Sequence, residues 1–314
     1  MIAHTTLGVR ALRIEISNMA NTQPLEIGSA HVALHTGDGA IVPGTDRALK
    51  FSGNESFVVP PGALLVSDLV DLLKGNVTGS VDMPDPAKTY YLCLTGDDVL
   101  TPADSYAIVA LGDSITDGLA TAVDGNATWP AWLTKQLAAV KRTRNVAVLN
   151  QGISGNQVVR DGAGVSALAR FDRDVPGRPG VKWIILLEGI NDINIRGRST
   201  GPDALTSDEL IAGYRQIIER AHVTGIKMRS AIIMPEEEVP TASERGEEIR
   251  QTVNRWNRAK GNFDAVVDFD LILQDRSHPA RLNPAFNPGD HTHPDDAGNK
   301  AMADAIDLII FAGQ

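Results

Sequence analysis

A serine, a histidine and an aspartate are placed where they could carry out acyl transfer together. Ser114 follows a run of apolar residues, within the segment 112–118 (GDSITDG). A serine hydroxyl attacks a carbonyl carbon only when a nearby base removes its proton. Asp290 and His293 are three residues apart, so one turn can place the carboxylate against the imidazole. This spacing predicts that Asp290 orients His293 and that His293 activates Ser114.

The same residues allow other interpretations. A serine in a glycine-rich turn is also a common helix cap, and the segment lacks the Gly-x-Ser-x-Gly pattern of α/β-hydrolases. His291 and His293, with the aspartates at 290, 295 and 296, could instead bind zinc or manganese. No second cluster of histidine and aspartate has a matching spacing. We therefore expect no metal and no other cofactor, and we expect His291 to be a surface-loop residue.

Acyl transfer also requires hydrogen-bond donors for the negative charge that develops on the carbonyl oxygen. The segment 150–156 contains Gly152 and Gly155, and either glycine could bring a backbone N–H close to a ligand. The segment 188–192 places the side-chain amide of Asn191 after an apolar run. Asp192 could simply anchor its own loop through backbone N–H groups. The residues of each loop, taken alone, are also typical of an ordinary turn with no function.

From residue 106 onward, apolar strands alternate with helical patterns. The expected strands are 106–111, 146–149, 181–187, 230–234 and 265–267, and the expected helices include 129–140, 206–225, 241–261 and 296–310. Thr128 is a plausible cap for the first of these helices, and Asp295 for the last. Strands that are apolar on both faces predict a five-stranded parallel sheet covered on both sides, a doubly wound α/β/α sandwich. Such sheets bind ligands beyond the carboxyl ends of their strands, which is where the segments above lie.

The first 105 residues have a different pattern. Short strands are expected at 12–16, 31–34, 56–59 and 88–94, separated by turns rich in glycine and proline, such as 36–39. Only 66–73 suggests a helix. The sequence therefore predicts two domains, a β-sandwich accessory domain over residues 1–105 and a catalytic domain over residues 106–314.

The composition excludes several classes of protein. The net charge of −10 disfavours nucleic acid as a partner, because an acidic surface repels phosphate. No uncharged apolar run reaches about 18 residues, so we expect no membrane span. The N-terminus shows no secretion signal. Cys93 is the only cysteine, which excludes an internal disulfide.

Four segments give the chain a resemblance to the SGNH/GDSL serine hydrolases, a superfamily of esterases and acylhydrolases. They are 112–114 (GDS), 153–156 (ISGN), 189–192 (GIND) and 290–294 (DHTHP), in the family's order. The resemblance implies a flavodoxin-like SGNH fold and a triad of Ser114, Asp290 and His293. It also implies an oxyanion hole formed by the N–H of Ser114, the N–H of Gly155 and the side chain of Asn191. Gly152 is then left with a role in the turn.

The N-terminal part is similar to the β-domain that precedes the hydrolase domain in a bacterial GDSL-like lipase/acylhydrolase subgroup. The segments 27–34 and 41–47 carry this likeness, which implies a small all-β, jelly-roll-like domain. Related proteins are often exported, so the sequence leaves the compartment open between export and the cytoplasm. A β-domain of this kind could form a wall of the cleft, bind a carbohydrate or mediate dimerisation, so a homo-oligomer is also left open.

The resemblance implies a substrate that is a small-molecule or acylated-carbohydrate ester, and we favour a carboxylesterase acting on short-chain acyl or acetyl esters. One alternative is a carbohydrate-binding protein with polysaccharide deacetylase-type esterase activity. The small number of aromatic residues in the first 105 positions disfavours it. Another alternative is a metal-dependent hydrolase that uses His291 and His293. Trp129, Trp132 and Trp183 follow the apolar faces of expected elements, so we expect them in the core rather than in a pocket.

Overall fold

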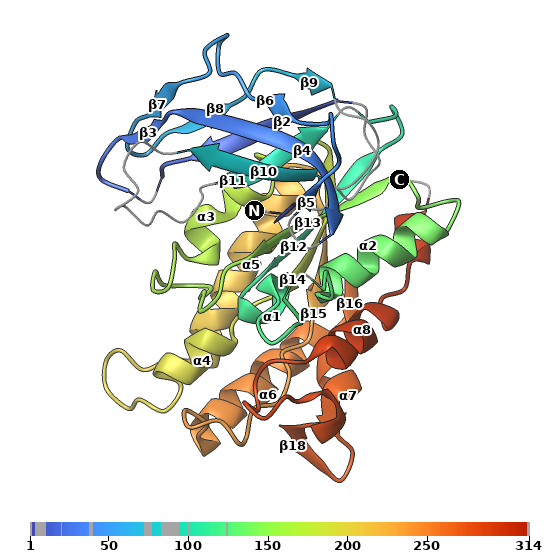
Figure 1. Cartoon of the computed structure of the whole chain (residues 1–314). Coiled ribbons are helices and arrows are strands. Elements are labelled where there is room, and N and C mark those ends of the chain that lie inside the picture. Colours follow the sequence, from blue (N-terminus) through green and yellow to red (C-terminus); the bar gives the residue numbers. More distant parts are fainter. Residues whose placement is uncertain are drawn as a thin grey trace. The chain divides into compact units, whose positions relative to one another are not determined.

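The computed structural model describes residues 2–3, 11–19, 21–37, 40–71, 77–82, 94–99, 101–123 and 125–312 (Figure 1). The chain divides into two compact units, Met1–Ala103 and Asp104–Gln314, next to the domain boundary expected from the sequence. Each unit has a hydrophobic core of its own.

The first unit is a small all-β region, as predicted, built from antiparallel strands. One sheet contains β1 (Ile2–Ala3), β10 (Val77–Asp82), β4 (Ser29–Gly37), β5 (Ala40–Ile41) and β6 (Arg47–Ala48). A second contains β11 (Leu94–Val99), β2 (Ala11–Ser17), β8 (Leu64–Val66) and β9 (Val70–Asp71), and a third pairs β3 (Leu25–Ile27) with β7 (Phe57–Val59). Apolar side chains from β2, β3, β4 and β7 form the core of this unit.

Several details of the first unit differ from the prediction. The expected helix over residues 66–73 is wrong for the residues that the structure describes, because β8 and β9 both pair with β2. Within β2, Glu15 is buried, whereas Arg13 is exposed. Residues 38–39 of the expected turn, residues 72–73 of the expected helix and residues 88–93 of the expected strand lie outside the described residues, and Leu94 begins β11.

The second unit contains a five-stranded parallel sheet in the order β13-β12-β14-β15-β16. Its strands are β12 (Tyr106–Gly112), β13 (Val146–Gly152), β14 (Val181–Leu187), β15 (Lys227–Ala231) and β16 (Ala265–Val267). Helices α2 (Trp129–Ala139) and α8 (Asp296–Asp304) lie on one side of the sheet, and α3 (Ala167–Asp174), α5 (Ser207–Val223) and α6 (Glu244–Arg258) lie on the other (Figure 1). This is the predicted doubly wound α/β/α fold.

Short elements complete this unit. They are α1 (Ser114–Asp117), α4 (Ile190–Arg196), α7 (Phe269–Leu273), the β17 (Gln274–Asp275) and β18 (His278–Leu282) hairpin, and the 3-10 turns η1 (Pro284–Phe286) and η2 (Ile309–Phe311). Both α1 and α4 begin directly beyond the carboxyl end of a strand. None of the helices within the described residues is both long and apolar enough to cross a membrane.

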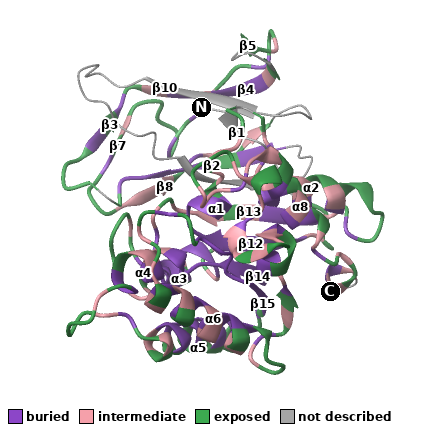
Figure 2. Cartoon of the chain, turned by 90° about the horizontal axis from the view of Figure 1, so that it is seen from below, coloured by how far each residue is buried: buried purple, intermediate pink, exposed green. Residues whose placement is uncertain are grey.

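The central strands of the sheet are buried, and the purple of β14 in Figure 2 shows this for one of them. Every residue of β12 is buried. Trp129 and Trp183 lie in the core as expected, whereas Trp132 is only partly buried. Strands that are apolar on both faces are stable in a sheet only where helices cover both sides.

Most predicted helix starts are confirmed, and several other boundaries differ from the prediction. Thr128 caps α2, as expected, and Thr206 caps α5, at the expected start of that helix, but α6 begins at Glu244 with Ser243 as its cap, not at residue 241. The fourth strand was expected at residues 230–234 and lies at 227–231, because its partner β14 ends at residue 187 and offers no further pairing. The last helix ends at Asp304 rather than at residue 310.

Candidate active site

Ser114 is the first residue of α1, directly beyond the carboxyl end of β12. The cap of this short helix is Asp113, whose Oδ1 accepts the N–H of Ile115 at 2.9 Å. The alternative role of Ser114 as a helix cap is therefore wrong. Gly112 is required here, since a Cβ at this position would lie 2.4 Å from the carbonyl oxygen of Leu187. Because Asp113 caps α1, the Ser114 hydroxyl is free for another partner.

That partner is His293. The Oγ atom of Ser114 lies 2.8 Å from Nε2 of His293, and Nδ1 of His293 lies 2.7 Å from Oδ2 of Asp290. Oδ1 of Asp290 also accepts the backbone N–H groups of Thr292 and His293, so the carboxylate is fixed by its own turn. An ionised Asp290 can only accept, which assigns the proton of His293 to Nδ1 and leaves Nε2 as the acceptor for the serine hydroxyl.

The surroundings of Asp290 stabilise the ionised form of its carboxyl group. Partial burial would raise the pKa of its carboxyl group, but the two backbone N–H groups and the imidazole N–H outweigh this effect and lower the pKa. The carboxyl group is therefore ionised near neutral pH. An ionised carboxylate at this distance stabilises the imidazolium that forms when His293 accepts a proton.

The residues of the alternative metal site have other contacts. His291 lies with Nδ1 2.9 Å from Oε2 of Glu238, on a partly exposed loop, where we expected it. Asp295 caps α8, as expected, and Oδ1 of Asp296 accepts the N–H of Ala122. Within the part of the chain that the structure describes, no group of three or more His, Cys, Asp or Glu residues could hold a metal ion.

The segment that contains Gly155 forms a tight turn next to Ser114. The N–H of Asn156 donates to the carbonyl oxygen of Ile153 at 3.0 Å, and Gly155 has a φ of +77°, typical of the third position of a type II turn. The N–H of Ile153 donates in turn to the carbonyl oxygen of Gly112. This bond ties the turn to the end of the strand that precedes Ser114.

Gly155 and Gly152 are constrained for different reasons. A Cβ at residue 155 would lie 2.6 Å from the Cβ of Ala163, and the positive φ would add strain. A Cβ at residue 152 would lie 2.2 Å from the backbone nitrogen of Asp117, so Gly152 allows α1 to approach β13 closely. Gly152 thus ends β13 and allows this close approach, rather than forming part of the turn itself.

The side chain of Asn191, near the start of α4, faces the same turn. Its Nδ2 donates to the carbonyl oxygen of Asn156 at 3.0 Å, which uses one of its two N–H bonds. Among the described residues, neither the N–H of Ser114 nor that of Gly155 has a hydrogen-bond acceptor. The three donors named from the sequence thus come from neighbouring strand ends and retain unused N–H bonds.

Asp192 anchors a second loop besides its own. Its buried carboxylate accepts the N–H of Val158 at 2.8 Å and that of Val159 at 3.2 Å, in the segment that follows the Gly155 turn. Burial raises the pKa of Asp192 to about 6, although these two N–H groups oppose the shift. The residue therefore joins α4 to the loop after β13.

The structure reveals a group of buried carboxyl groups that sequence reasoning missed. Asp113, Glu188 and Glu236 line a cavity of about 10 Å³ beside α1, which has room for one water molecule. Burial raises the pKa of Asp113 to about 7 and that of Glu236 to about 8, and raises the pKa of Glu188 as well. Glu236 begins a run of three glutamates, which is typical of a solvated surface, so the sequence carries no signal of its burial.

A larger cavity of about 320 Å³ lies between α4 and the start of α6. Ile190, Ile193, Asn194 and Glu236 are among the residues that line it. Nδ2 of Asn194 donates to Oε2 of Glu236 at 2.6 Å. Ile190 and Glu236 also line the small cavity beside Asp113, but neither Ser114 nor His293 lines either cavity.

Comparison with known protein families identifies the second unit. A model of the GDSL-like lipase/acylhydrolase family matches residues 110–301, which is more than half of the chain. The chain belongs to this family. As a GDSL-type acylhydrolase it is a hydrolase that acts on esters. No curated protein matches the chain.

Several solved structures resemble this GDSL-type chain over about two thirds of its length. A GDSL-like lipase from Bacteroides thetaiotaomicron is 21% identical, with a TM-score of 0.49, over 66% of this chain and 89% of the lipase. An acetylxylan esterase from Geobacillus stearothermophilus is 23% identical, with a TM-score of 0.46, over 64% of this chain and 91% of the esterase. A G-D-S-L family protein from Desulfitobacterium hafniense is 20% identical, with a TM-score of 0.48, over 64% of this chain and 97% of that protein.

Proposed function

We propose that this GDSL-type hydrolase is a serine-dependent carboxylic ester hydrolase that works through an acyl-enzyme. The observation that carries the proposal is the unbroken series Ser114–His293–Asp290, with hydrogen-bond distances of 2.8 and 2.7 Å. In this series Ser114 is the nucleophile and His293 is the general base. Asp290 orients His293 and stabilises its imidazolium form. The domain division proposed from the sequence places all three residues in the catalytic domain, 106–314.

The reaction has two halves. His293 accepts the hydroxyl proton as Oγ of Ser114 bonds to the ester carbonyl carbon, and the carbonyl oxygen becomes an oxyanion. The carbon–oxygen bond to the alcohol breaks, and His293 returns the proton to the leaving alkoxide. Water then attacks the acyl-enzyme, His293 takes one of its protons and gives it back to Ser114, and the carboxylic acid leaves.

The oxyanion is proposed to accept hydrogen bonds from the N–H of Ser114, the N–H of Gly155 and Nδ2 of Asn191. The unused N–H bonds of these three groups support this role. Donors that are already fixed in place need no reorganisation when charge develops on the oxygen. The bond from Asn191 to the carbonyl of Asn156 holds this amide still.

We infer that the substrates are short-chain acyl or acetyl esters. This choice follows the resemblance to the GDSL-type esterases, since neither Ser114 nor His293 is among the residues that line the cavity of about 320 Å³.

A series of p-nitrophenyl esters from acetate to palmitate tests both parts of the proposal. We expect the highest kcat/KM for acetate to butyrate, no loss of activity with a chelator, and no turnover by Ser114→Ala. Inactivation of the parent chain by a chelator, reversed by added zinc or manganese, would favour the metal-dependent alternative. Parental turnover by Ser114→Ala would overturn the proposal.

A further inference from the structure

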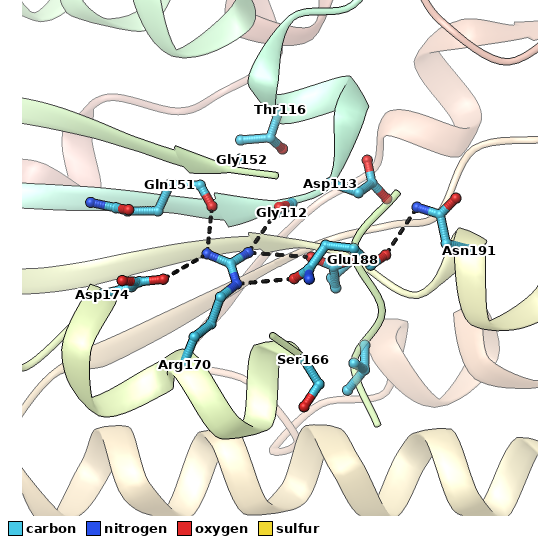
Figure 3. A network of polar contacts seen from close by, with 12 residues as sticks. Gly112, Asp113, Thr116, Gln151, Gly152, Ser166, Arg170, Asp174, Glu188 and Asn191 are labelled. Atoms are coloured by element: carbon cyan, nitrogen blue, oxygen red, sulfur yellow. Dashed lines mark hydrogen bonds and ion pairs between the residues drawn. The ribbon is translucent and has the colours of Figure 1, made fainter. Parts of the chain in front are cut away.

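A buried arginine lies beneath the strand ends that carry the candidate site. Arg170 is in α3, and its side chain is fully buried. Nη2 donates to the carbonyl oxygen of Gly112 at 3.0 Å, and Nη1 donates to that of Gln151 at 2.8 Å. Figure 3 shows the guanidinium group pointing at these two carbonyl groups. One side chain thus binds the ends of β12 and β13 together.

The third edge of the guanidinium group contacts the turn that contains Gly155. Nε donates to Oδ1 of Asn156 at 2.9 Å, and this interaction is also buried. The backbone carbonyl of the same Asn156 accepts Nδ2 of Asn191. Arg170 therefore contacts the strand end before Ser114 directly, holds the turn of Gly155, and reaches Asn191 through one intervening residue.

Burial of a charged arginine is costly unless its charge and its N–H groups are matched. Oδ2 of Asp174 lies 2.9 Å from Nη1 and balances the charge of the guanidinium group, while Oε2 of Glu188 lies further away, 3.8 Å from Nη2 (Figure 3). An apolar side chain of similar size could fill this space without that cost. It could not hold three acceptors from three segments in one plane, and neither could the single ammonium group of lysine.

We propose that Arg170 is a positioning residue that sets the geometry of the oxyanion donors. The inference rests on the proposed function, because it concerns the same three donors. Arg170 does not touch the substrate. It holds the end of β12 and the Gly155 turn at a fixed separation, so that the N–H groups of Ser114 and Gly155 point at one position.

Two substitutions of Asn156 separate this role from simple packing. Asn156→Leu and Asn156→Asp both lose the bond from Nδ2 to the carbonyl oxygen of Val165. Only Asn156→Asp keeps an acceptor for Nε of Arg170. We expect kcat of Asn156→Leu to fall about 10²-fold below that of Asn156→Asp, because a displacement of about 1 Å at the reacting groups has an effect of this size. KM should change little.

The second measurement uses a methyl trifluoromethyl ketone, which forms a tetrahedral adduct with a serine nucleophile and so requires the oxyanion donors. We expect its affinity to fall in parallel with kcat for Asn156→Leu and for Arg170→Lys. Asp174→Asn is the control, since it removes a partner of Arg170 that contacts neither strand end. This control should lower the melting temperature while retaining kcat and ketone affinity per folded molecule.

Equal kcat values for Asn156→Leu and Asn156→Asp would overturn the inference. So would a parental ketone affinity in Arg170→Lys. If Arg170→Lys does not fold, the two Asn156 variants decide the question by themselves. These results are distinct from failure of the proposed function, which would appear as turnover by Ser114→Ala.

Discussion

The hydroxyl oxygen of Ser114 lies 2.8 Å from Nε2 of His293, although the two residues are 179 positions apart in the chain. The contact depends on how the last helix is attached. Oδ1 of Asn299 in α8 accepts the N–H of Trp129 at the start of α2, and its Nδ2 donates to the carbonyl of Pro294. The buried amide of Asn299 thus fixes the loop of His293 against the helix that follows the Ser114 segment.

Replacement of Asp290 tests whether its charge is used. Asp290→Asn should retain the fold and lose up to about 10⁴-fold in kcat, because an amide can stabilise the wrong tautomer of His293 and cannot stabilise the imidazolium. Steady-state kinetics with p-nitrophenyl acetate, together with near-UV circular dichroism, would measure both properties. A kcat within threefold of the parent value would remove Asp290 from the triad.

Asn191→Ala addresses the oxyanion donors directly. Loss of one donor lowers kcat by a factor on the order of 10²–10³ and has a much smaller effect on ground-state binding. The variant should fold, since its amide makes a single bond to the carbonyl of Asn156. Kinetic constants for the variant and the parent chain would check this expectation. Equal activity would show that Asn191 lies outside the site.

Asp192 is expected to act through the loop that it holds. In Asp192→Asn an NH₂ group replaces one of the two carboxylate oxygens. This donor would face the N–H of Val158 or Val159, and the two donors could not form a hydrogen bond. An unsatisfied buried group of this kind costs about 1–3 kcal/mol. Urea denaturation should show a loss of this size in the free energy of unfolding. An unchanged midpoint with an unchanged m-value would contradict the anchoring role.

The buried carboxyl groups predict an unusual dependence of stability on pH. Glu236 faces Asn194, with Asp113, Arg250 and Asp290 as charged neighbours, and burial raises its pKa to about 8 in the folded state. The folded chain therefore holds a proton that the unfolded chain releases near pH 4.5. The resulting stabilisation is complete below about pH 4.5 and is lost as the pH rises through 8.

Glu236→Gln is neutral at every pH and should remove this part of the dependence. The free energy of unfolding of the parent should fall between pH 5 and pH 8.5, aided by Asp113 and Asp192, whose pKa values are raised to about 7 and about 6. The curve of Glu236→Gln should be flatter over that range. Glu248→Gln, at an exposed position of α6, is the matched control. Parallel curves for the parent and Glu236→Gln would refute the prediction.

The sequence by itself determined the order of the elements and the composition of the candidate triad. Apolar runs bounded by turn residues located the parallel strands, and Thr128, Thr206 and Asp295 marked helix starts, because capping is a local interaction. The parallel sheet then places the ends of its strands at one edge, so Ser114 and Asn191 could be expected near each other from local patterns.

Only the tertiary structure decided which polar residues are buried. Arg170 and Glu236 lie in segments that are typical of solvated surface, and their burial results from contacts with distant strands and loops. The same holds for the end of β15, which is set by the length of its neighbour β14 and not by its own apolar run. Local propensity and periodicity act over a few residues, whereas burial and strand pairing depend on residues far apart in the chain, which meet only when the sheet forms.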